Sequence, residues 1–404
     1  MIHVKKEQLD FLNWEFGVFF HFGIRTFYEG HKDWDMKPMA LSAFDPSELD
    51  CEEWIRTVWE AGGKYAVLVC KHHDGFANWP SAYTEYSVKN TPWKNGRGDV
   101  VREFTDACRK YGLKVGLYYS PAQFDSAERS AKDYDDYFIH QIRELLTNYG
   151  TIDYLWFDGC GSEGHEYDTA RIVRAIRACQ PQILLFNMWD PDTRWMGNEA
   201  GIAHSPNDLT VEELDFSVLT EDRSALSRAK FLPAECDCRM RLENWFYSDN
   251  DVDTVKSVDE LMGLYYYSVG RGANLLLNIG PDRRGKLPEP DKTALLAFGR
   301  KIQELTRDDI PCSVEAGEKK LTLSFDLGLV NHVILTEEIT GEEIGQFEIR
   351  VQPYPYGTPV TVYRGTTVGH KAICPFPTIR TTKVEILFDR DKKVTAALKY
   401  LPRY

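Results

Sequence analysis

The sequence predicts a (β/α)8-like TIM barrel over residues 1–310, followed by a small antiparallel β-sandwich over residues 311–404. Three observations lead to this prediction. Short apolar runs alternate with amphipathic segments along the first part of the chain, as in a parallel sheet covered by helices. The runs are apolar almost throughout, so both faces of the sheet are expected to be buried. After residue 310 the pattern changes to short alternating strands separated by Gly and Pro.

Seven apolar runs are the predicted barrel strands, and this number within about 280 residues favours a closed barrel over an open sheet. Between them lie segments with apolar residues at helical spacing, each ending in Gly, such as residues 47–63, 98–112 and 134–150. The strands are expected at residues 16–23, 65–73, 114–120, 154–159, 183–187, 231–236 and 273–281.

Composition and charge narrow the class of protein. The net charge of −14 argues against a nucleic acid or an anionic membrane as partner. The N-terminal stretch lacks a signal peptide's apolar core, and no run approaches the roughly 20 apolar residues of a membrane span. Nine cysteines without paired CxxC motifs are expected to be reduced thiols. We therefore expect a cytoplasmic enzyme. The sequence does not indicate its oligomeric state. Its high aromatic content, 13%, suits a sugar-binding cleft.

Polar side chains stand where the predicted strands end. In a barrel of parallel strands these carboxyl ends meet at one rim, where such enzymes keep their reactive groups. One polar strand end is ordinarily a cap or turn residue, but seven in register indicate an active rim. The side chains are His21, His72 with His73, Tyr118 with Tyr119 and Ser120, Asp158, Asn187, Glu235 and Asn278.

The run YLWFDG at residues 154–159 brings a carboxylate and an indole to this rim. Alternation along a strand puts Trp156 and Asp158 on one face, toward the barrel mouth. The alternative role for Asp158 is to cap a following helix, but CGSEGHEYDTA delays the next helix to about Thr169. We therefore expect Asp158 to be a nucleophile or general base.

A glycosidase needs a second carboxyl group flanking the scissile bond. The candidates are Glu199, in DTRWMGNEAG, and Glu235, in LPAECDC, because neither segment resembles a solvated helical face. Spacing alone does not choose between them.

Metal chemistry is an alternative use of the histidines. His72 and His73, adjacent on an extended strand, are expected to point to opposite faces and to chelate poorly. The sequence lacks HExxH and HxH motifs, and no DxD cluster lies near the histidine pair to supply a third ligand. His21, one of the pair and Asp158 could still assemble a site in three dimensions. Histidines that hydrogen-bond substrate hydroxyls fit these positions better, so we expect no metal and no cofactor.

Five segments together resemble glycoside hydrolase family 29, the retaining α-L-fucosidases, in order and spacing over residues 11 to about 290. They are FGVFFHFG, AGGKYAVLVCKHHDGFANWPSAYTEYSV, GLKVGLYYSP, DYLWFDG and GANLLLNIGPDRRGKLPE. The resemblance implies a barrel that is often irregular in its later helices, and a C-terminal domain like the predicted sandwich. It also implies cleavage of terminal α-L-fucose with retention of configuration.

Carried over residue by residue, the resemblance identifies Asp158 as the nucleophile. RWMGNEAG is similar to the branch that prefers α1,3- and α1,4-linked fucose, in which Glu199 would be the acid/base. In the other branch the glutamate corresponds to Glu235, which remains the alternative. The implied substrate-binding residues are His21, Asp33 (where the family often has Glu), Trp34, His72, His73, Tyr118 or Tyr119, Trp156, Arg194, Glu235 and Trp245.

The sequence thus predicts a retaining exo-α-L-fucosidase acting on Lewis-type fucosylated oligosaccharides. Three other functions stay open at this stage. They are a non-catalytic glycan-binding protein, a glycosidase for another sugar such as a galactoside, and a metal-dependent hydrolase on the same barrel.

Overall fold

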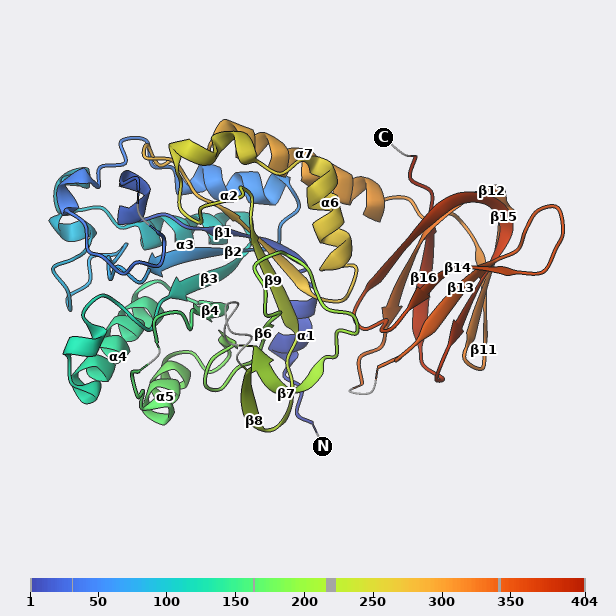
Figure 1. Cartoon of the computed structure of the whole chain (residues 1–404), viewed down its shortest axis with the longest axis horizontal. Coiled ribbons are helices and arrows are strands. Elements are labelled where there is room, and N and C mark those ends of the chain that lie inside the picture. Colours follow the sequence, from blue (N-terminus) through green and yellow to red (C-terminus); the bar gives the residue numbers. More distant parts are fainter. Residues whose placement is uncertain (1, 31, 163, 216–222, 341–342, 403–404) are drawn as a thin grey trace.

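The computed structural model describes residues 2–30, 32–162, 164–215, 223–340 and 343–402. Its larger part is an almost closed barrel of eight parallel strands, in the order β5-β4-β3-β2-β1-β10-β9-β6, wrapped by helices (Figure 1). The barrel strands are β1 (Phe16–Phe20), β2 (Tyr65–Lys71), β3 (Lys114–Tyr119), β4 (Tyr154–Phe157), β5 (Leu184–Phe186), β6 (Arg194–Trp195), β9 (Ala234–Arg239) and β10 (Asn274–Ile279). The predicted barrel is confirmed.

All seven predicted strands are present, and β6 is an eighth that the sequence did not indicate. It has two residues, too few for any periodicity to appear. β6 pairs with β9, and a single parallel bridge from Phe186 to Thr193 links it toward β5. This short strand and bridge bring the two edges of the sheet together.

Helices pack on the outside of the strands where the amphipathic segments predicted them. They are α2 (Cys51–Glu60), α3 (Val100–Tyr111), α4 (Ala131–Asn148), α5 (Thr169–Cys179), α6 (Val258–Tyr267) and α7 (Glu289–Thr306). Between β6 and β9 the hairpin of β7 (Thr210–Asp215) and β8 (Arg223–Phe231) occupies the place of a barrel helix. The barrel is therefore irregular in its later part.

Side chains alternate between two cores. On β1, Val18 and Phe20 belong to the outer core between strands and helices, whereas Phe19 lies in the barrel interior. The interior is aromatic: Phe11 of α1 (Lys6–Leu12) packs against Tyr154, with ring centroids 5.3 Å apart. The barrel is thus filled by side chains at its amino end.

The C-terminal part is an antiparallel sheet of β11 (Ser313–Gly317), β12 (Lys320–Glu337), β13 (Phe347–Val351), β14 (Val360–Gly365), β15 (Ala372–Phe388) and β16 (Val394–Lys399). The long strands β12 and β15 carry register shifts, and their two halves pair with different neighbours. The sheet therefore folds over its own apolar core, as predicted for a sandwich. The predicted domain boundary at 310/311 falls between α7 and β11.

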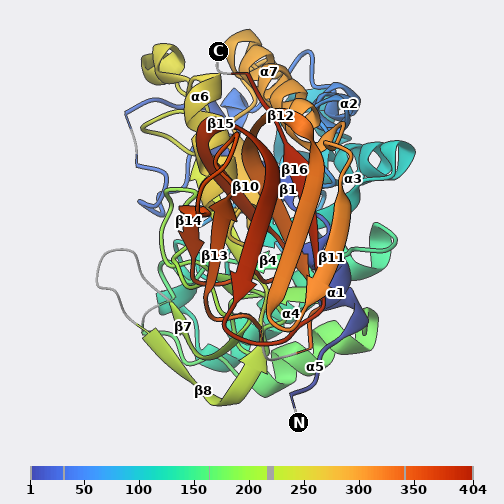
Figure 2. The ribbon, with the colours of Figure 1, turned by 90° about the vertical axis from the view of Figure 1, so that its right-hand side faces the viewer.

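This sheet packs against the amino end of the barrel (Figures 1 and 2). Arg271, just before β10, bridges to Ala372 of β15, and the Tyr266 hydroxyl lies 3.0 Å from the His332 ring. The carboxyl rim at the opposite end stays clear of the C-terminal sheet. Within the described ranges, the helices are too short or too polar to cross a membrane.

Candidate active site

A cavity of about 350 Å³ opens at the carboxyl rim of the barrel. Its size fits a small ligand, and its wall combines aromatic rings with a few charged groups. Most of the predicted residues line it, namely His21, Asp33, Trp34, His72, His73, Tyr118, Trp156, Asp158, Glu199 and Trp245. The ends of β1, β2, β3, β4 and β5 thus converge on one cavity, whereas Glu235 of β9 and Asn278 of β10 do not line it.

Asp158 follows β4 directly and is held by three donors. The Tyr118 hydroxyl donates to its Oδ2 over 2.9 Å, and the backbone N–H of Cys160 donates to Oδ1 over 2.9 Å. The Nε2 of His73 lies 3.4 Å from Oδ2. Burial alone would raise the pKa of Asp158, but the His73 charge and these hydrogen bonds hold it below the ordinary value. Asp158 is therefore an ionised carboxylate.

His73 is the cationic partner in this pair. Although burial opposes its charge, Asp158 raises the pKa of His73 to about 9. The other ring nitrogen, Nδ1, lies 2.6 Å from the Ser120 hydroxyl oxygen. At neutral pH both ring nitrogens of His73 thus carry protons and face acceptors.

The expectation that His72 and His73 point to opposite faces is wrong. β2 ends at Lys71 with a register irregularity, so the two histidines lie beyond the regular pleat and both line the cavity. One atom each of His72, His73 and Asp158 lie within 4.8 Å of one another, a spacing that could hold a metal ion. The same geometry also places the His73 ring against the Asp158 carboxylate as an ion pair.

His21 and His72 are neutral. Burial lowers the pKa of His21 to about 3 and that of His72 well below its ordinary value. Nδ1 of His21 lies 2.7 Å from Asn278 Oδ1, at the end of β10. The His72 ring stacks on Tyr118 at 5.5 Å, and its Nδ1 is buried without a hydrogen-bond partner among the described residues. Both rings can exchange hydrogen bonds with sugar hydroxyls.

The pKa of Glu199 is shifted in the opposite direction from that of Asp158. Its half-buried carboxyl lines the same cavity, in the segment after β6. Burial raises its pKa, the charge of Asp158 adds to this, and the nearby Arg239 offsets only part of it. Backbone N–H groups on either side tie the segment to β9: Met196 donates to the Glu235 carbonyl and Gly201 to the Asp237 carbonyl, both over 3.1 Å.

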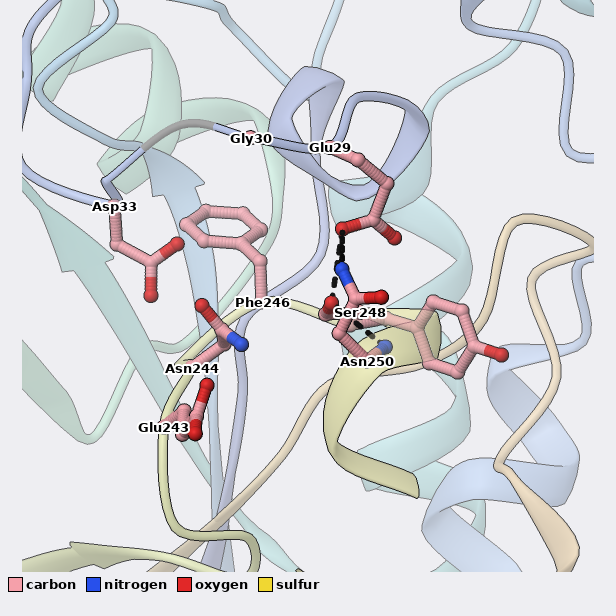
Figure 3. Close-up of a pocket in the computed structure, with 9 residues that line it drawn as sticks. Glu29, Gly30, Asp33, Glu243, Asn244, Phe246, Ser248 and Asn250 are labelled. Atoms are coloured by element: carbon pink, nitrogen blue, oxygen red, sulfur yellow. Dashed lines mark hydrogen bonds between the residues drawn. The ribbon is translucent and has the colours of Figure 1, made fainter. Parts of the chain in front are cut away.

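A smaller pocket, of about 190 Å³, adjoins the cavity and shares Asp33 with it (Figure 3). Glu29 accepts hydrogen bonds there from the Ser248 hydroxyl over 2.9 Å and the Asn250 amide over 3.3 Å. Asp33 accepts the backbone N–H of Trp245 over 2.7 Å. These acids brace the loop that carries Trp245, which forms a wall of the main cavity.

Three predicted residues lie away from the cavity, and for these the expectation is corrected. Tyr119 faces the helix layer, where its hydroxyl donates to Gln141 of α4 over 2.6 Å. Arg194 points out of the barrel and donates to Asn207 over 2.6 Å. Glu235 is fully buried beneath the cavity floor, where three side chains donate to it. Of the two candidate acids, only Glu199 lines the cavity.

The structure adds cavity residues that sequence reasoning missed, including Trp195, Asp237 and Arg239. The predicted strand at 231–236 stopped too early, whereas β9 continues to Arg239. Alternation from Glu235 would have put residues 237 and 239 on the same face. Likewise, Arg194 was predicted to bind substrate, but the residue that lines the cavity is its neighbour, Trp195.

The barrel and its cavity together identify the kind of enzyme. A parallel (β/α)-barrel whose rim brings an ionised and a protonation-prone carboxyl to one aromatic cavity is the arrangement of a glycoside hydrolase. A family model described as alpha-L-fucosidase matches residues 39–304. The chain therefore belongs to the α-L-fucosidase family, glycoside hydrolase family 29.

Relatives and solved structures agree with this assignment. Alpha-L-fucosidase 1 of Arabidopsis thaliana is 30% identical, over 97% of this chain and 86% of its own length. The structure of a putative alpha-L-fucosidase from Bacteroides thetaiotaomicron has a TM-score of 0.88 at 31% identity, covering 98% of this chain and 96% of that one. A glycoside hydrolase 29 family member from an unknown rumen bacterium has a TM-score of 0.90 at 31% identity, covering 99% and 78%.

Proposed function

We propose that this protein is a retaining exo-α-L-fucosidase that releases terminal L-fucose from α1,3/1,4-fucosylated oligosaccharides. The observation that carries the proposal is the pair of carboxyl groups in one cavity whose pKa values are shifted in opposite directions. Asp158 is held ionised by His73, and Glu199 is driven toward its protonated form by burial. A nucleophile and a general acid need these states at the same pH.

The reaction proceeds by double displacement. The Asp158 carboxylate attacks the anomeric carbon and forms a glycosyl ester, while Glu199 gives its proton to the departing glycosidic oxygen. Glu199, now ionised, takes a proton from water, and the hydroxide oxygen bonds to the anomeric carbon. The ester bond breaks, Asp158 recovers its electron pair, and fucose leaves with retained configuration. Tyr118 and the Cys160 N–H keep the Asp158 oxygens aimed throughout.

Sugar recognition is assigned to the histidines and the aromatic wall. Neutral His21 and His72 offer hydrogen bonds to ring hydroxyls, whereas the ring nitrogens of His73 face Ser120 and Asp158, so that His73 serves to hold Asp158 ionised. Trp245, backed by Asp33, is suited to pack on the C6 methyl group of fucose, the apolar part that distinguishes this sugar from a galactoside. The linkage preference rests on the Gly197–Asn198–Glu199 motif and its resemblance to one branch of the family.

The test is release of L-fucose from a Lewis-type trisaccharide, from an α1,2-linked fucoside and from an aryl fucoside, with Asp158→Asn beside wild type. We expect release from the trisaccharide and the aryl fucoside, little from the α1,2 linkage, and none by the variant. Release from the aryl and α1,2 substrates alone would contradict the linkage preference. No release from any of them, with fucose still bound, would indicate a glycan-binding protein, and turnover of a galactoside instead would indicate another sugar.

A further inference from the structure

Three tryptophans of the cavity wall are each held by one residue of β9. Glu235, Asp237 and Arg239 alternate along this strand and so share its inner face. Oε1 of Glu235 accepts the Trp156 indole N–H over 2.8 Å, and Oδ1 of Asp237 accepts that of Trp195 over 2.8 Å. The Arg239 guanidinium lies 5.5 Å from the centroid of the Trp245 ring.

Glu235 does not line the cavity, so it can reach a substrate only through its neighbours. Besides the indole, it accepts the Tyr65 hydroxyl over 2.7 Å and the Tyr154 hydroxyl over 3.3 Å, and it is fully buried. These contacts fix the carboxyl group from below. Because an indole N–H has one direction, the carboxyl oxygen sets the tilt of the Trp156 ring.

Trp156 passes this constraint on to the proposed nucleophile. Its ring stacks on Phe186 on one side, with centroids 4.1 Å apart, and on Tyr118 on the other, at 5.4 Å. The Tyr118 hydroxyl in turn donates to Asp158. A change in the indole orientation would therefore move the hydroxyl that aims the Asp158 carboxylate.

Asp237 acts on the other wall. It is 4% exposed and holds the indole of Trp195, the residue that precedes the Met196–Gly201 segment. The two backbone bonds from that segment to β9 flank Glu199. Orienting Trp195 thus fixes the start of the segment on which the proposed acid/base lies.

From these contacts we infer that Glu235 and Asp237 are positioning residues, which orient Trp156 and Trp195 and through them the two reacting carboxyl groups. This inference rests on the proposed function. It also gives Glu235 a role other than the acid/base that its segment suggested, since an acceptor oxygen is needed and a transferable proton is not.

Substitutions at Glu235 separate these two roles. In Glu235→Gln the amide oxygen can accept the Trp156 N–H, while the amide nitrogen faces Tyr65, whose hydroxyl can turn to the Leu275 carbonyl 3.5 Å away. We expect Glu235→Gln to keep kcat/KM for an aryl fucoside within about 3-fold of wild type. Glu235→Leu, which removes the acceptor, should lower it about 10-fold or more. Likewise, Asp237→Asn is expected to keep a higher kcat/KM than Asp237→Leu.

Trp156→Phe removes the donor and should lower kcat/KM similarly. Combined with Glu235→Leu it should cause no further loss, because the two residues act as one unit. Glu337→Gln is the matched control: Glu337 is a buried carboxyl of β12 that accepts backbone N–H groups far from the cavity, and its neutralisation should leave kcat/KM unchanged. Thermal melting of each variant checks folding. If Glu235→Leu does not fold, the two single variants Trp156→Phe and Glu235→Gln still test the inference.

The outcomes are distinct. Wild type without fucoside turnover would overturn the proposed function. With wild type active, a loss of about 100-fold or more in a folded Glu235→Gln would overturn the inference and make Glu235 a proton donor. Full activity in Glu235→Leu, or in Trp156→Phe, would equally overturn it, because the acceptor–indole contact would then have no effect on the reaction.

Discussion

The buried carboxyl of Glu235 makes the stability of the barrel depend on pH. Burial raises the pKa of Glu235 to about 7, against an ordinary value of 4.5, although the hydrogen bonds from Tyr65, Trp156 and Tyr154 partly oppose this. The folded protein therefore keeps a proton that the unfolded chain releases between pH 4.5 and 7. Stability must fall across this window, because there the folded state binds more protons than the unfolded state.

The size of this effect follows from the difference in pKa. At about 1.4 kcal/mol for each pH unit, the window costs the folded state about 3 kcal/mol. Glu235→Gln cannot ionise and escapes this loss. Relative to wild type, the variant should therefore gain about 3 kcal/mol in free energy of unfolding between pH 4.5 and pH 7.5. For a barrel of this size that corresponds to about 5 °C in melting temperature.

The assay is the melting temperature of both proteins at half-unit intervals from pH 4.5 to 8. The exposed Glu318→Gln, in the turn before β12, serves as the control and should follow wild type throughout. A difference between Glu235→Gln and wild type that stays constant, or shrinks as the pH rises, would show that ionisation of Glu235 does not destabilise the folded barrel.

Four further predictions concern the cavity. Asp158→Asn should lower the pKa of His73 from about 9 toward its ordinary value, since the carboxylate charge is the cause of the rise; NMR titration of the histidine would measure it, and an unchanged pKa would contradict the ion pair. The pH profile of kcat/KM should be a bell, with an acid limb below 3.8 from Asp158 and an alkaline limb above 4.5 from Glu199. Arg239→Gln should move the alkaline limb to higher pH, because the Arg239 charge lowers the pKa of Glu199, and a shift to lower pH would be the wrong sign. Prolonged dialysis against a chelator should leave fucoside turnover unchanged, whereas loss that zinc or manganese restores would favour the metal-dependent alternative.

Much of this architecture follows from the sequence because the signals are repetitive. Seven buried strands that alternate with helices along the chain predict a barrel. Alternation of side chains in YLWFDG correctly put Trp156 and Asp158 toward the barrel mouth. β6 was not predicted, because a strand of two residues is too short to show a periodic pattern. His72 and His73 were misjudged because alternation was extended past the end of β2, where the chain leaves the pleat.

Depth along a strand is the other quantity that the sequence does not give. Glu235 and Asp237 share one face of β9, yet only Asp237 reaches the cavity, because the level at which each residue meets its neighbours depends on the stagger of the barrel. For the same reason the polar end of an apolar run can lie below the cavity floor. Side-chain direction also decides which of two adjacent residues lines the cavity. Trp195 and Tyr118 do so, whereas their neighbours Arg194 and Tyr119 do not.

Hydrolysis of an α-L-fucoside by Asp158 and Glu199 through double displacement fixes the configuration of the first-formed sugar, which can be measured. Proton NMR of an aryl α-L-fucoside, recorded within the first minutes after adding wild-type enzyme, distinguishes the two anomers before they equilibrate. Double displacement gives α-L-fucose first, and the β anomer then grows in only by mutarotation. If β-L-fucose appears first, water attacks directly and Asp158 is not a nucleophile.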